Sequence, residues 1–261
     1  EGIGAELVRE HASDEDSLIR VLTGADVVLA QYAPLTERVL ATLDRCKGIV
    51  RYGVGFDTVD VPAATKHGIY VCNVPDYGTD EVSDHAITLL LAIARKLIVA
   101  AEGVQRGTWS VEPIKPVGRL RGRTLGIIGL GRIGSLTAAK AQGFGIRVIA
   151  HDPGLPASAF TERNVTPVGL DELLQTSDYV SIHAPLSAAT RHLIDARALS
   201  LMKPSAFLIN TARGGLVVEK DLAAALNTGR LAGAGLDVLS AEPPPADNPL
   251  LTATHCLVTP H

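Results

Sequence analysis

The chain has 261 residues, a formal net charge of −4 and 46% hydrophobic residues. This length accommodates about two domains with a large buried core. The slight negative charge provides no general attraction for nucleic acid or anionic membranes, so neither is expected as a partner. The 3 cysteines form no C-x-x-C pair, which favours a reduced, cytoplasmic setting. The 8 histidines form no H-x-x-x-H or H-E-x-x-H pattern, so no metal site is predicted.

In the first part of the chain, short apolar runs alternate with helical patterns. We expect strands near residues 27–30, 48–52 and 69–73, and helices near 14–23, 36–43 and 61–67. A long helix is then predicted from about Asp80 to Gln105. Its apolar stretch is interrupted by Arg95 and Lys96 and is far shorter than a membrane span, so a buried helix is the better interpretation.

The same alternation continues to the end of the chain. Strands are expected near residues 124–129, 147–151, 179–183, 206–210, 234–238 and 257–259, with helices between most of them. Strands that alternate with helices predict parallel sheets with crossover connections. The expected fold class is therefore α/β, with two Rossmann-like or flavodoxin-like doubly wound parallel-sheet domains joined by a long helix. We expect the domains to cover residues 1–94 and 95–261, the second with six strands.

A glycine-rich turn follows the strand expected at 124–129. Gly129, Gly131 and Gly134 have the G-x-G-x-x-G spacing, and an Ala-rich helix follows them. These glycines permit a tight turn, a close approach to a pyrophosphate and close packing of the helix on the strand. Backbone N–H groups of Arg132 and Ile133 would meet the pyrophosphate. A plain glycine turn is the alternative, but the flanking strand and helix favour a dinucleotide site.

An acidic residue, Asp152, ends the next expected strand, 152 − 134 = 18 positions after the last glycine. A carboxylate there accepts hydrogen bonds from ribose hydroxyls and repels a 2′-phosphate. No Arg or Lys follows it directly in His151-Asp-Pro-Gly. The predicted cofactor is therefore NAD rather than NADP.

Polar residues at the carboxyl ends of the later strands are the candidates for chemistry, because ligands bind there in such sheets. They are Arg213, Asp237, Glu242 and His261. A histidine exchanges protons near neutral pH, a neighbouring carboxylate favours imidazolium, and an arginine grips an anionic substrate. Each residue alone has a structural alternative: a hydrogen-bonded histidine, a turn-capping arginine or a solvated carboxylate.

The order and joint occurrence of these motifs resemble the D-isomer-specific 2-hydroxyacid dehydrogenases. The matching segments are Gly129-Leu-Gly-Arg-Ile-Gly, Asn210-Thr-Ala-Arg-Gly-Gly, Gly235-Leu-Asp-Val with Ala241-Glu-Pro, and Thr259-Pro-His. The resemblance implies that His261 is the acid/base, that Glu242 pairs with it, and that Arg213 binds the substrate. It places Asp237 near the nicotinamide carboxamide.

The resemblance extends to the first domain and to further cofactor contacts. Arg51-Tyr-Gly-Val-Gly-Phe-Asp is similar to the family's substrate loop, although an ordinary glycine loop is the alternative. It implies substrate binding by Arg51, Tyr52, Gly53, Val54, Gly55 and Arg213. It implies cofactor binding by Thr79, Ala184, Pro185, Thr211, Ala212, Arg213 and His261, beside the glycine loop, Asp152 and Asp237. Thr79 has the alternative role of a helix N-cap.

The resemblance implies an NAD-dependent oxidoreductase that interconverts a small D-2-hydroxy acid and its 2-keto acid. Residues 1–94 would bind substrate, in a domain incomplete at its N-terminus and completed by a segment after His261. Residues 95–261 would bind NAD and form a homodimer, since the family packs the arm around Trp109 on a second subunit; a local core position is the alternative. The alternative function is NAD(H)-sensing corepression, as in the C-terminal-binding-protein branch, which retains the Arg213, Glu242 and His261 set. Which 2-hydroxy acid is used stays open among phosphoglycerate, glyoxylate, hydroxypyruvate and others.

Overall fold

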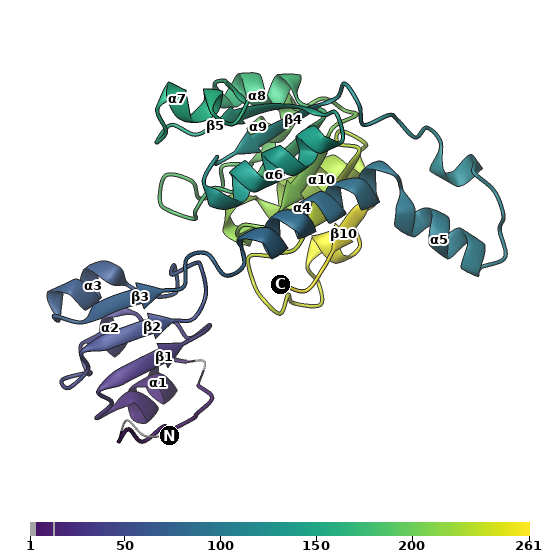
Figure 1. Cartoon of the computed structure of the whole chain (residues 1–261). Helices are drawn as coiled ribbons and strands as arrows, with labels where there is room; N and C mark the ends of the chain where they lie inside the picture. The colour runs from purple at the N-terminus through teal and green to yellow at the C-terminus, as the bar shows by residue number, and fades with distance from the viewer. Residues whose placement is uncertain (1–3, 13) are drawn as a thin grey trace. The chain divides into compact units, whose positions relative to one another are not determined.

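The structure, a computed structural model, describes residues 4–12 and 14–261. It divides into two compact units, Glu1–Gly78 and Thr79–His261 (Figure 1). Each unit has a parallel sheet with helical crossovers, which confirms the predicted α/β class.

The first unit is built on a three-stranded parallel sheet in the order β1-β2-β3. Its strands lie within two residues of the predicted ranges, while the second helix is shorter than predicted. The elements are α1 (Glu15–Leu22), β1 (Val27–Ala30), α2 (Glu37–Leu40), β2 (Gly48–Arg51), α3 (Val61–Lys66) and β3 (Tyr70–Asn73).

Among the described residues of the first unit, the helices cover one face of this sheet. Val28 and Ile49 point into the core with residues of all three helices. On the other face Val27 and Leu29 of β1 are more than half exposed, at 56% and 58%, and Tyr70 of β3 is 79% exposed. Parallel sheets ordinarily bury both faces. The second face of this sheet therefore carries exposed apolar side chains in the part of the unit that the structure describes.

The second unit contains a seven-stranded parallel sheet in the order β10-β9-β8-β7-β4-β5-β6. The six predicted strands are confirmed, and the seventh was missed because β6 has only two residues and carries no readable pattern. Every residue of β4, β7 and β9 is buried, which explains apolar runs without alternation. The strands are β4 (Thr124–Ile128), β5 (Arg147–His151), β6 (Thr166–Pro167), β7 (Tyr179–Ile182), β8 (Phe207–Asn210), β9 (Gly233–Leu236) and β10 (Cys256–Val258).

Helices cover both faces of this sheet. Two hydrophobic clusters lie on its two sides, one beneath α4 and α6 and the other beneath α8, α9 and α10. The helices are α4 (Thr79–Ala94), α5 (Leu97–Gln105), α6 (Arg132–Gly143), α7 (Ala157–Thr161), α8 (Leu170–Thr176), α9 (Ala196–Leu201) and α10 (Glu219–Asn227), with short 3-10 turns η1 (Glu112–Ile114), η2 (Gly214–Leu216) and η3 (Pro249–Leu251).

The single helix predicted over residues 80–105 is wrong. The chain forms α4 and α5, separated at Lys96, whose φ of 51° lies in the left-handed region. Seven residues of α4 are buried, including Leu89 and Leu90, whereas all residues of α5 are at least partly exposed. The helix ends where its contact with the sheet ends, and the residues on either side have ordinary helix propensity.

The predicted domain boundary at residues 94/95 also differs from the division at Gly78/Thr79. The difference is α4, which packs against α6, β8 and β9 of the second unit. A Cβ atom on Gly235 of β9 would lie 3.0 Å from the Cβ of Leu89, so this glycine allows the close approach. Helix α4 therefore belongs to the second unit and not to the first.

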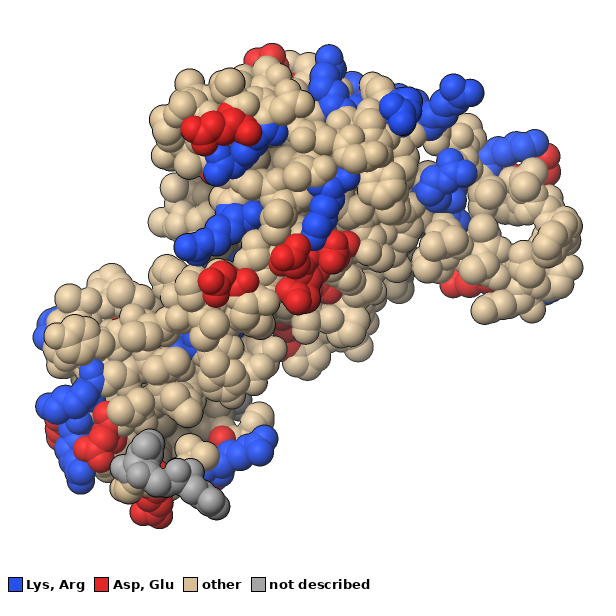
Figure 2. All heavy atoms as spheres, viewed as in Figure 1, with Lys and Arg blue, Asp and Glu red and all other residues tan. Residues whose placement is uncertain are grey.

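The described residues show neither a membrane-spanning helix nor, on the visible face, a continuous basic surface. Within residues 4–12 and 14–261, every helix is too short or too polar to cross a bilayer. In the view of Figure 2, lysine and arginine side chains are scattered among aspartate and glutamate. A surface that binds nucleic acid gathers its basic side chains into a patch or stripe.

Candidate active site

The three glycines of the loop between β4 and α6 have different structural roles. Gly129 has a φ of 91°, and a Cβ atom there would lie 2.7 Å from the backbone nitrogen of Ala184. A Cβ on Gly134 would lie 2.1 Å from the carbonyl oxygen of Gly129. A Cβ on Gly131 would meet no atom of the described residues within 4 Å. Two glycines are thus required by packing, and Gly131 alone faces open space.

Helix α6 begins directly at this open space. Gly131 is its N-cap, and no side chain of the described residues caps it. The N–H groups of Arg132 and Ile133, in the first turn, have no acceptor within the helix. With the positive end of the helix dipole, they form a site for an anion.

Asp152, just after β5, is held rigidly beside the loop. The N–H of Leu130 donates a hydrogen bond to its Oδ2 at 2.8 Å, and the N–H of Gly154 donates to its Oδ1 at 3.0 Å. Because each oxygen accepts a backbone hydrogen bond, the carboxylate has a fixed orientation. The negative charge predicted for the ribose position is therefore present next to the glycine loop.

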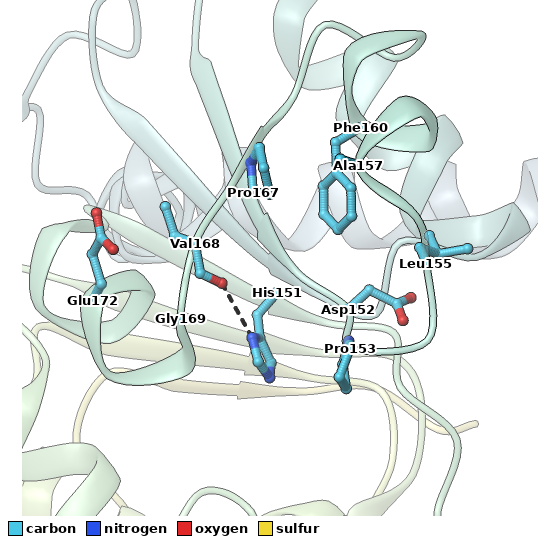
Figure 3. Close-up of a pocket in the computed structure, with 10 residues that line it drawn as sticks. All are labelled: His151, Asp152, Pro153, Leu155, Ala157, Phe160, Pro167, Val168, Gly169 and Glu172. Carbon is cyan, nitrogen blue, oxygen red and sulfur yellow. Dashed lines mark hydrogen bonds between the residues drawn. The ribbon is translucent and has the colours of Figure 1, made fainter.

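A pocket of about 510 Å³ adjoins Asp152 (Figure 3). Leu155, Phe160 and Pro167 supply apolar walls, and the Nδ1 of His151 lies 3.2 Å from the Val168 carbonyl oxygen. Its ten drawn residues include two carboxylates and no lysine or arginine. The pocket is suited to a flat, largely apolar group beside a ribose, and it offers no cation for a 2′-phosphate.

The strand ends on the other side of the loop also carry predicted residues. Ala184 and Pro185 follow β7, and Thr211 and Ala212 follow β8. The hydroxyl of Thr211 is buried and has no hydrogen-bond partner among the described residues. Buried hydroxyl groups are ordinarily paired, so this atom marks a place where a ligand supplies the partner. The orphan hydroxyl, the open Gly131 and the anchored Asp152 all fit a dinucleotide.

Glu242 and His261 form the central pair of the site. The Nδ1 of His261 lies 2.7 Å from Oε2 of Glu242, and each side chain is 35% exposed. The other carboxylate oxygen, Oε1, accepts a hydrogen bond of 3.0 Å from the N–H of Leu239. The carboxylate is thus oriented by the backbone on one side and faces the imidazole on the other.

The predicted substrate anchor, Arg213, lies on the turn after β8. Its Nη1 donates to the Ala212 carbonyl oxygen at 2.7 Å. The buried amide of Asn210 accepts from the N–H of Ala212 at 3.0 Å and donates to the Arg213 carbonyl oxygen at 2.9 Å. A Cβ on the next residue, Gly214, would lie 2.0 Å from the carbonyl carbon of Leu239. The Arg213 turn is therefore packed directly against the segment that orients Glu242.

Asp237 has a partner that sequence analysis missed. The hydroxyl of Thr259 donates to Oδ1 of Asp237 at 2.6 Å. The Nε2 of His85, on α4, lies 2.9 Å from the Thr259 hydroxyl oxygen and 3.1 Å from the same Oδ1. His85 is 174 positions from Thr259 in the chain, so its only sequence signal was a histidine within an apolar helix.

Two further polar groups near these residues were missed. Glu219 of α10 accepts hydrogen bonds of 2.7 Å from Ser240 and from Asn248, and so ties down both ends of the loop that carries Glu242. His183, after β7, lies 2.9 Å from the Ser181 hydroxyl oxygen. Burial lowers the pKa of His183 to about 4, so this histidine is neutral at physiological pH.

The candidate substrate loop, residues 51–57, belongs to the first unit. Arg51 is 9% exposed and its side chain lies over Gly53, where a Cβ would be 1.0 Å from the Arg51 Nη1. Gly53 is thus needed for side-chain packing rather than for an unusual φ. The buried Nε of Arg51 lacks a hydrogen-bond partner in the part of the chain that the structure describes. Asn73 holds the loop through a 2.7 Å hydrogen bond to the Val54 carbonyl oxygen, and Tyr52 is 49% exposed.

The structure thus brings together some predicted site residues and leaves others in separate units. The glycine loop, Asp152, Arg213, Asp237, Glu242 and His261 all belong to the second unit, and Thr79 is the first residue of its α4. The loop from Arg51 to Gly55 belongs to the first. Across the described ranges, no cluster of three or more His, Cys, Asp or Glu could hold a metal ion.

Comparisons with known proteins agree with this arrangement. Residues 87–261 match the NAD binding domain of the D-isomer specific 2-hydroxyacid dehydrogenases. The chain is 40% identical over 258 residues to a glyoxylate reductase of Korarchaeum cryptofilum, which covers 98% of this chain and 75% of that protein. It is 39% identical over 249 residues to a D-3-phosphoglycerate dehydrogenase of Methanocaldococcus jannaschii, which covers 95% of this chain and 47% of that protein.

Among solved structures, the fold is similar to that of a D-lactate dehydrogenase from Aquifex aeolicus complexed with NAD and lactic acid. The TM-score is 0.87 at 32% identity, over 93% of this chain and 78% of that one. The chain spans about half the length of the D-3-phosphoglycerate dehydrogenase it matches, at 47%. With the family profile covering most of the chain, this protein belongs to the D-isomer specific 2-hydroxyacid dehydrogenases, a family of NAD-dependent oxidoreductases, and its second unit is the family's NAD-binding domain.

Proposed function

We propose that this chain interconverts a small D-2-hydroxy acid and its 2-keto acid. The observation that carries the proposal is the Glu242–His261 pair, with 2.7 Å between Oε2 and Nδ1, in the NAD-binding unit. NAD supplies or accepts the hydride when it is bound. What remains for the protein is to move one proton and to hold one anion.

His261 is the proposed acid/base. A carboxylate accepts hydrogen bonds only, so Glu242 selects the tautomer of His261 with its proton on Nδ1. Nε2 is then the atom that takes a proton from the hydroxyl during oxidation, and the imidazolium returns it to the carbonyl oxygen during reduction. The negative charge of Glu242 stabilises the imidazolium in both directions.

Arg213 is the proposed anchor of the substrate. A guanidinium binds a carboxylate in a bidentate manner and polarises a neighbouring carbonyl. For the first unit, we propose that the loop from Gly53 to Gly55, with Arg51 and Tyr52, binds substrate. The relatives are named for glyoxylate, phosphoglycerate and lactate, which are small 2-hydroxy or 2-keto acids or their derivatives.

We assign NAD rather than NADP as the preferred cofactor. The anchored carboxylate of Asp152 and the lack of a cation among the described residues of the adjoining pocket support this preference. The remaining proposed cofactor contacts are at the ends of the neighbouring strands and at the start of α4. These residues are Thr79, Ala184, Pro185, Thr211, Ala212 and Asp237.

A homodimer through the NAD-binding unit is the proposed assembly. Helix α5 lies apart from the sheet of its unit in Figure 1, and Leu97 and Val104 on it are 57% and 50% exposed. Trp109, just beyond it, is 90% exposed, which overturns a local core position within this chain. Exposed apolar surface of this kind marks a contact with another molecule.

The three cysteines are unpaired, which supports the reducing setting of the cytoplasm.

The test is the loss of NADH absorbance with a panel of 2-keto acids, run with the unaltered chain and with His261→Ala. We expect turnover on at least one acid and a loss of about 10²- to 10⁴-fold in the variant. His67→Ala, which removes an ion-paired histidine of the first unit, is the matched control and is expected to turn over normally. NADH binding without turnover on any acid would contradict the proposal and favour an NAD(H)-sensing corepressor.

A further inference from the structure

We propose that His85 is a positioning residue of this enzyme: it orients the Asp237 carboxylate and the Thr259 hydroxyl for the nicotinamide end of the cofactor. The proposal rests on the proposed function, because it takes Asp237 as the residue beside that end. It adds a residue on α4 whose side chain acts through two others.

The hydrogen bonds of this cluster have one consistent direction. The Thr259 hydroxyl donates to Oδ1 of Asp237 at 2.6 Å, so its oxygen is left to accept. The Nε2 of His85 is 2.9 Å from that oxygen and 3.1 Å from Oδ1, and both atoms are acceptors. Nε2 therefore carries a proton and is shared between them. Oδ2 of Asp237 takes part in neither contact and is the oxygen presented to a ligand amide.

The backbone alone does not orient these side chains. The N–H of Asp237 donates to the Asn210 carbonyl oxygen at 2.9 Å, and the N–H of Thr259 donates to the Leu236 carbonyl oxygen at 2.9 Å. These bonds place the two Cα atoms at the carboxyl edge of the sheet, but each side chain keeps its rotamers. Asp237 is only 19% exposed at its side chain, so the imidazole replaces water as its partner.

His85 comes from a rigid element. Its neighbour Ala86 is 1% exposed, and Ser83 on the preceding turn is fully buried. Lys140 of α6 pairs with Asp84 at 2.7 Å, one residue before His85. A side chain on a packed helix has a more precise position than one on a loop, which a residue that orients others requires.

The cluster also lies at the base of both segments that carry the acid/base pair. Thr259 is two residues before His261, and Asp237 begins the stretch that leads to Glu242. A change at His85 therefore acts first on the nicotinamide end and second on the proton-transfer pair. It leaves the glycine loop and Asp152, which hold the other end of the cofactor, unchanged.

The test compares two ligands on three forms of the full chain. The forms are the unaltered chain, His85→Leu, which removes the donor, and His85→Gln, whose Nε2 amide is placed to donate in the same direction. The ligands are NADH and ADP-ribose, which lacks the nicotinamide, and their dissociation constants are measured by calorimetry. We expect about tenfold weaker NADH binding in His85→Leu, unchanged ADP-ribose binding, and recovery in His85→Gln.

If His85→Leu weakened the binding of NADH and of ADP-ribose equally, the role of His85 would be merely structural. Unchanged NADH binding in this variant would overturn the proposal outright. If His85→Leu does not fold, Thr259→Val and Thr259→Ser replace the pair, with the same expectation of loss and recovery. Because binding is measured without turnover, the result is independent of whether any 2-keto acid is reduced. If the chain binds NADH but reduces no 2-keto acid, the proposed function is contradicted. The binding comparison still decides whether His85 orients the nicotinamide end.

Discussion

Replacing Glu242 by glutamine tests the acid/base pair with almost no change in shape. In the native site Oε2 faces Nδ1 of His261 at 2.7 Å, and Oε1 accepts from the Leu239 N–H at 3.0 Å. A glutamine has one oxygen and one amino group, so it satisfies only one of these positions in the native way. Both orientations of the amide carry a cost.

If the amide oxygen accepts from Leu239, the amino group faces His261 and Nδ1 must become an acceptor. The proton then moves to Nε2, which cannot take a proton from the substrate hydroxyl. If the amide is reversed, the Leu239 N–H faces an amino group and loses its acceptor, at about 1–3 kcal/mol. In either orientation the charge that stabilises the imidazolium is absent. We expect kcat/KM to fall about 10²-fold, which is about 2.7 kcal/mol of transition-state free energy.

The assay is the initial rate of NADH oxidation with the best 2-keto acid, accompanied by thermal unfolding and by the NADH dissociation constant. Glu242→Asp is the control, since it keeps the charge but shortens the reach to His261. The expected order of activity is native chain, then Glu242→Asp, then Glu242→Gln, with NADH binding unchanged in all three. A folded, NADH-binding Glu242→Gln chain with kcat/KM within about threefold of native would refute the role given to Glu242.

Two further predictions concern the cofactor loop and acid stability. Gly131→Ala is expected to have the same melting temperature as the native chain but to bind NADH at least tenfold more weakly, because its Cβ enters open space. In Gly134→Ala the Cβ meets the Gly129 carbonyl oxygen at 2.1 Å, so this variant should instead lose about 1–3 kcal/mol of stability. Equal melting temperatures for both variants would contradict this distinction. Burial alone would raise the pKa of Asp178, but hydrogen bonds from the Thr124 N–H and Lys203 outweigh it and hold the pKa below its ordinary value. Its stabilisation is therefore present above about pH 4 and lost as pH falls through the folded pKa. In urea unfolding at pH 7, the free energy of unfolding of Asp178→Asn should be about 1–3 kcal/mol below that of the native chain. This difference should disappear in acid, and a difference that does not change with pH would contradict the role given to the Asp178 carboxylate.

Most of the second unit was predictable because its signals are local. A strand, a glycine turn and a helix lie within about twenty consecutive residues, and Asp152 directly follows the next strand. The buried strands are continuous apolar runs, since helices cover both sheet faces. The residues of the candidate site, from Arg213 to His261, were identified as strand-end positions and by resemblance. The pairing of Glu242 with His261 is a contact across 19 positions that the fold supplies.

Other features depend on contacts between distant segments. Helix α4 ends at Ala94, just before the break at Lys96, and the residues on both sides of the break have ordinary helix propensity. The domain boundary follows from the packing of α4 on α6, which composition does not record. The two-residue strand β6 exists only because β5 pairs with it.

The sequence by itself determined the fold class, the glycine turn between a strand and a helix, and the acidic residue after the next strand, because periodicity and turn chemistry act over a few residues. Only the tertiary structure decided that His85 pairs with Asp237 and Thr259, and that Glu219 holds the loop of Glu242. Those contacts join residues that are tens to hundreds of positions apart. Such a partner is selected by the packing of α4 and α10 against the sheet, and no local pattern carries that information.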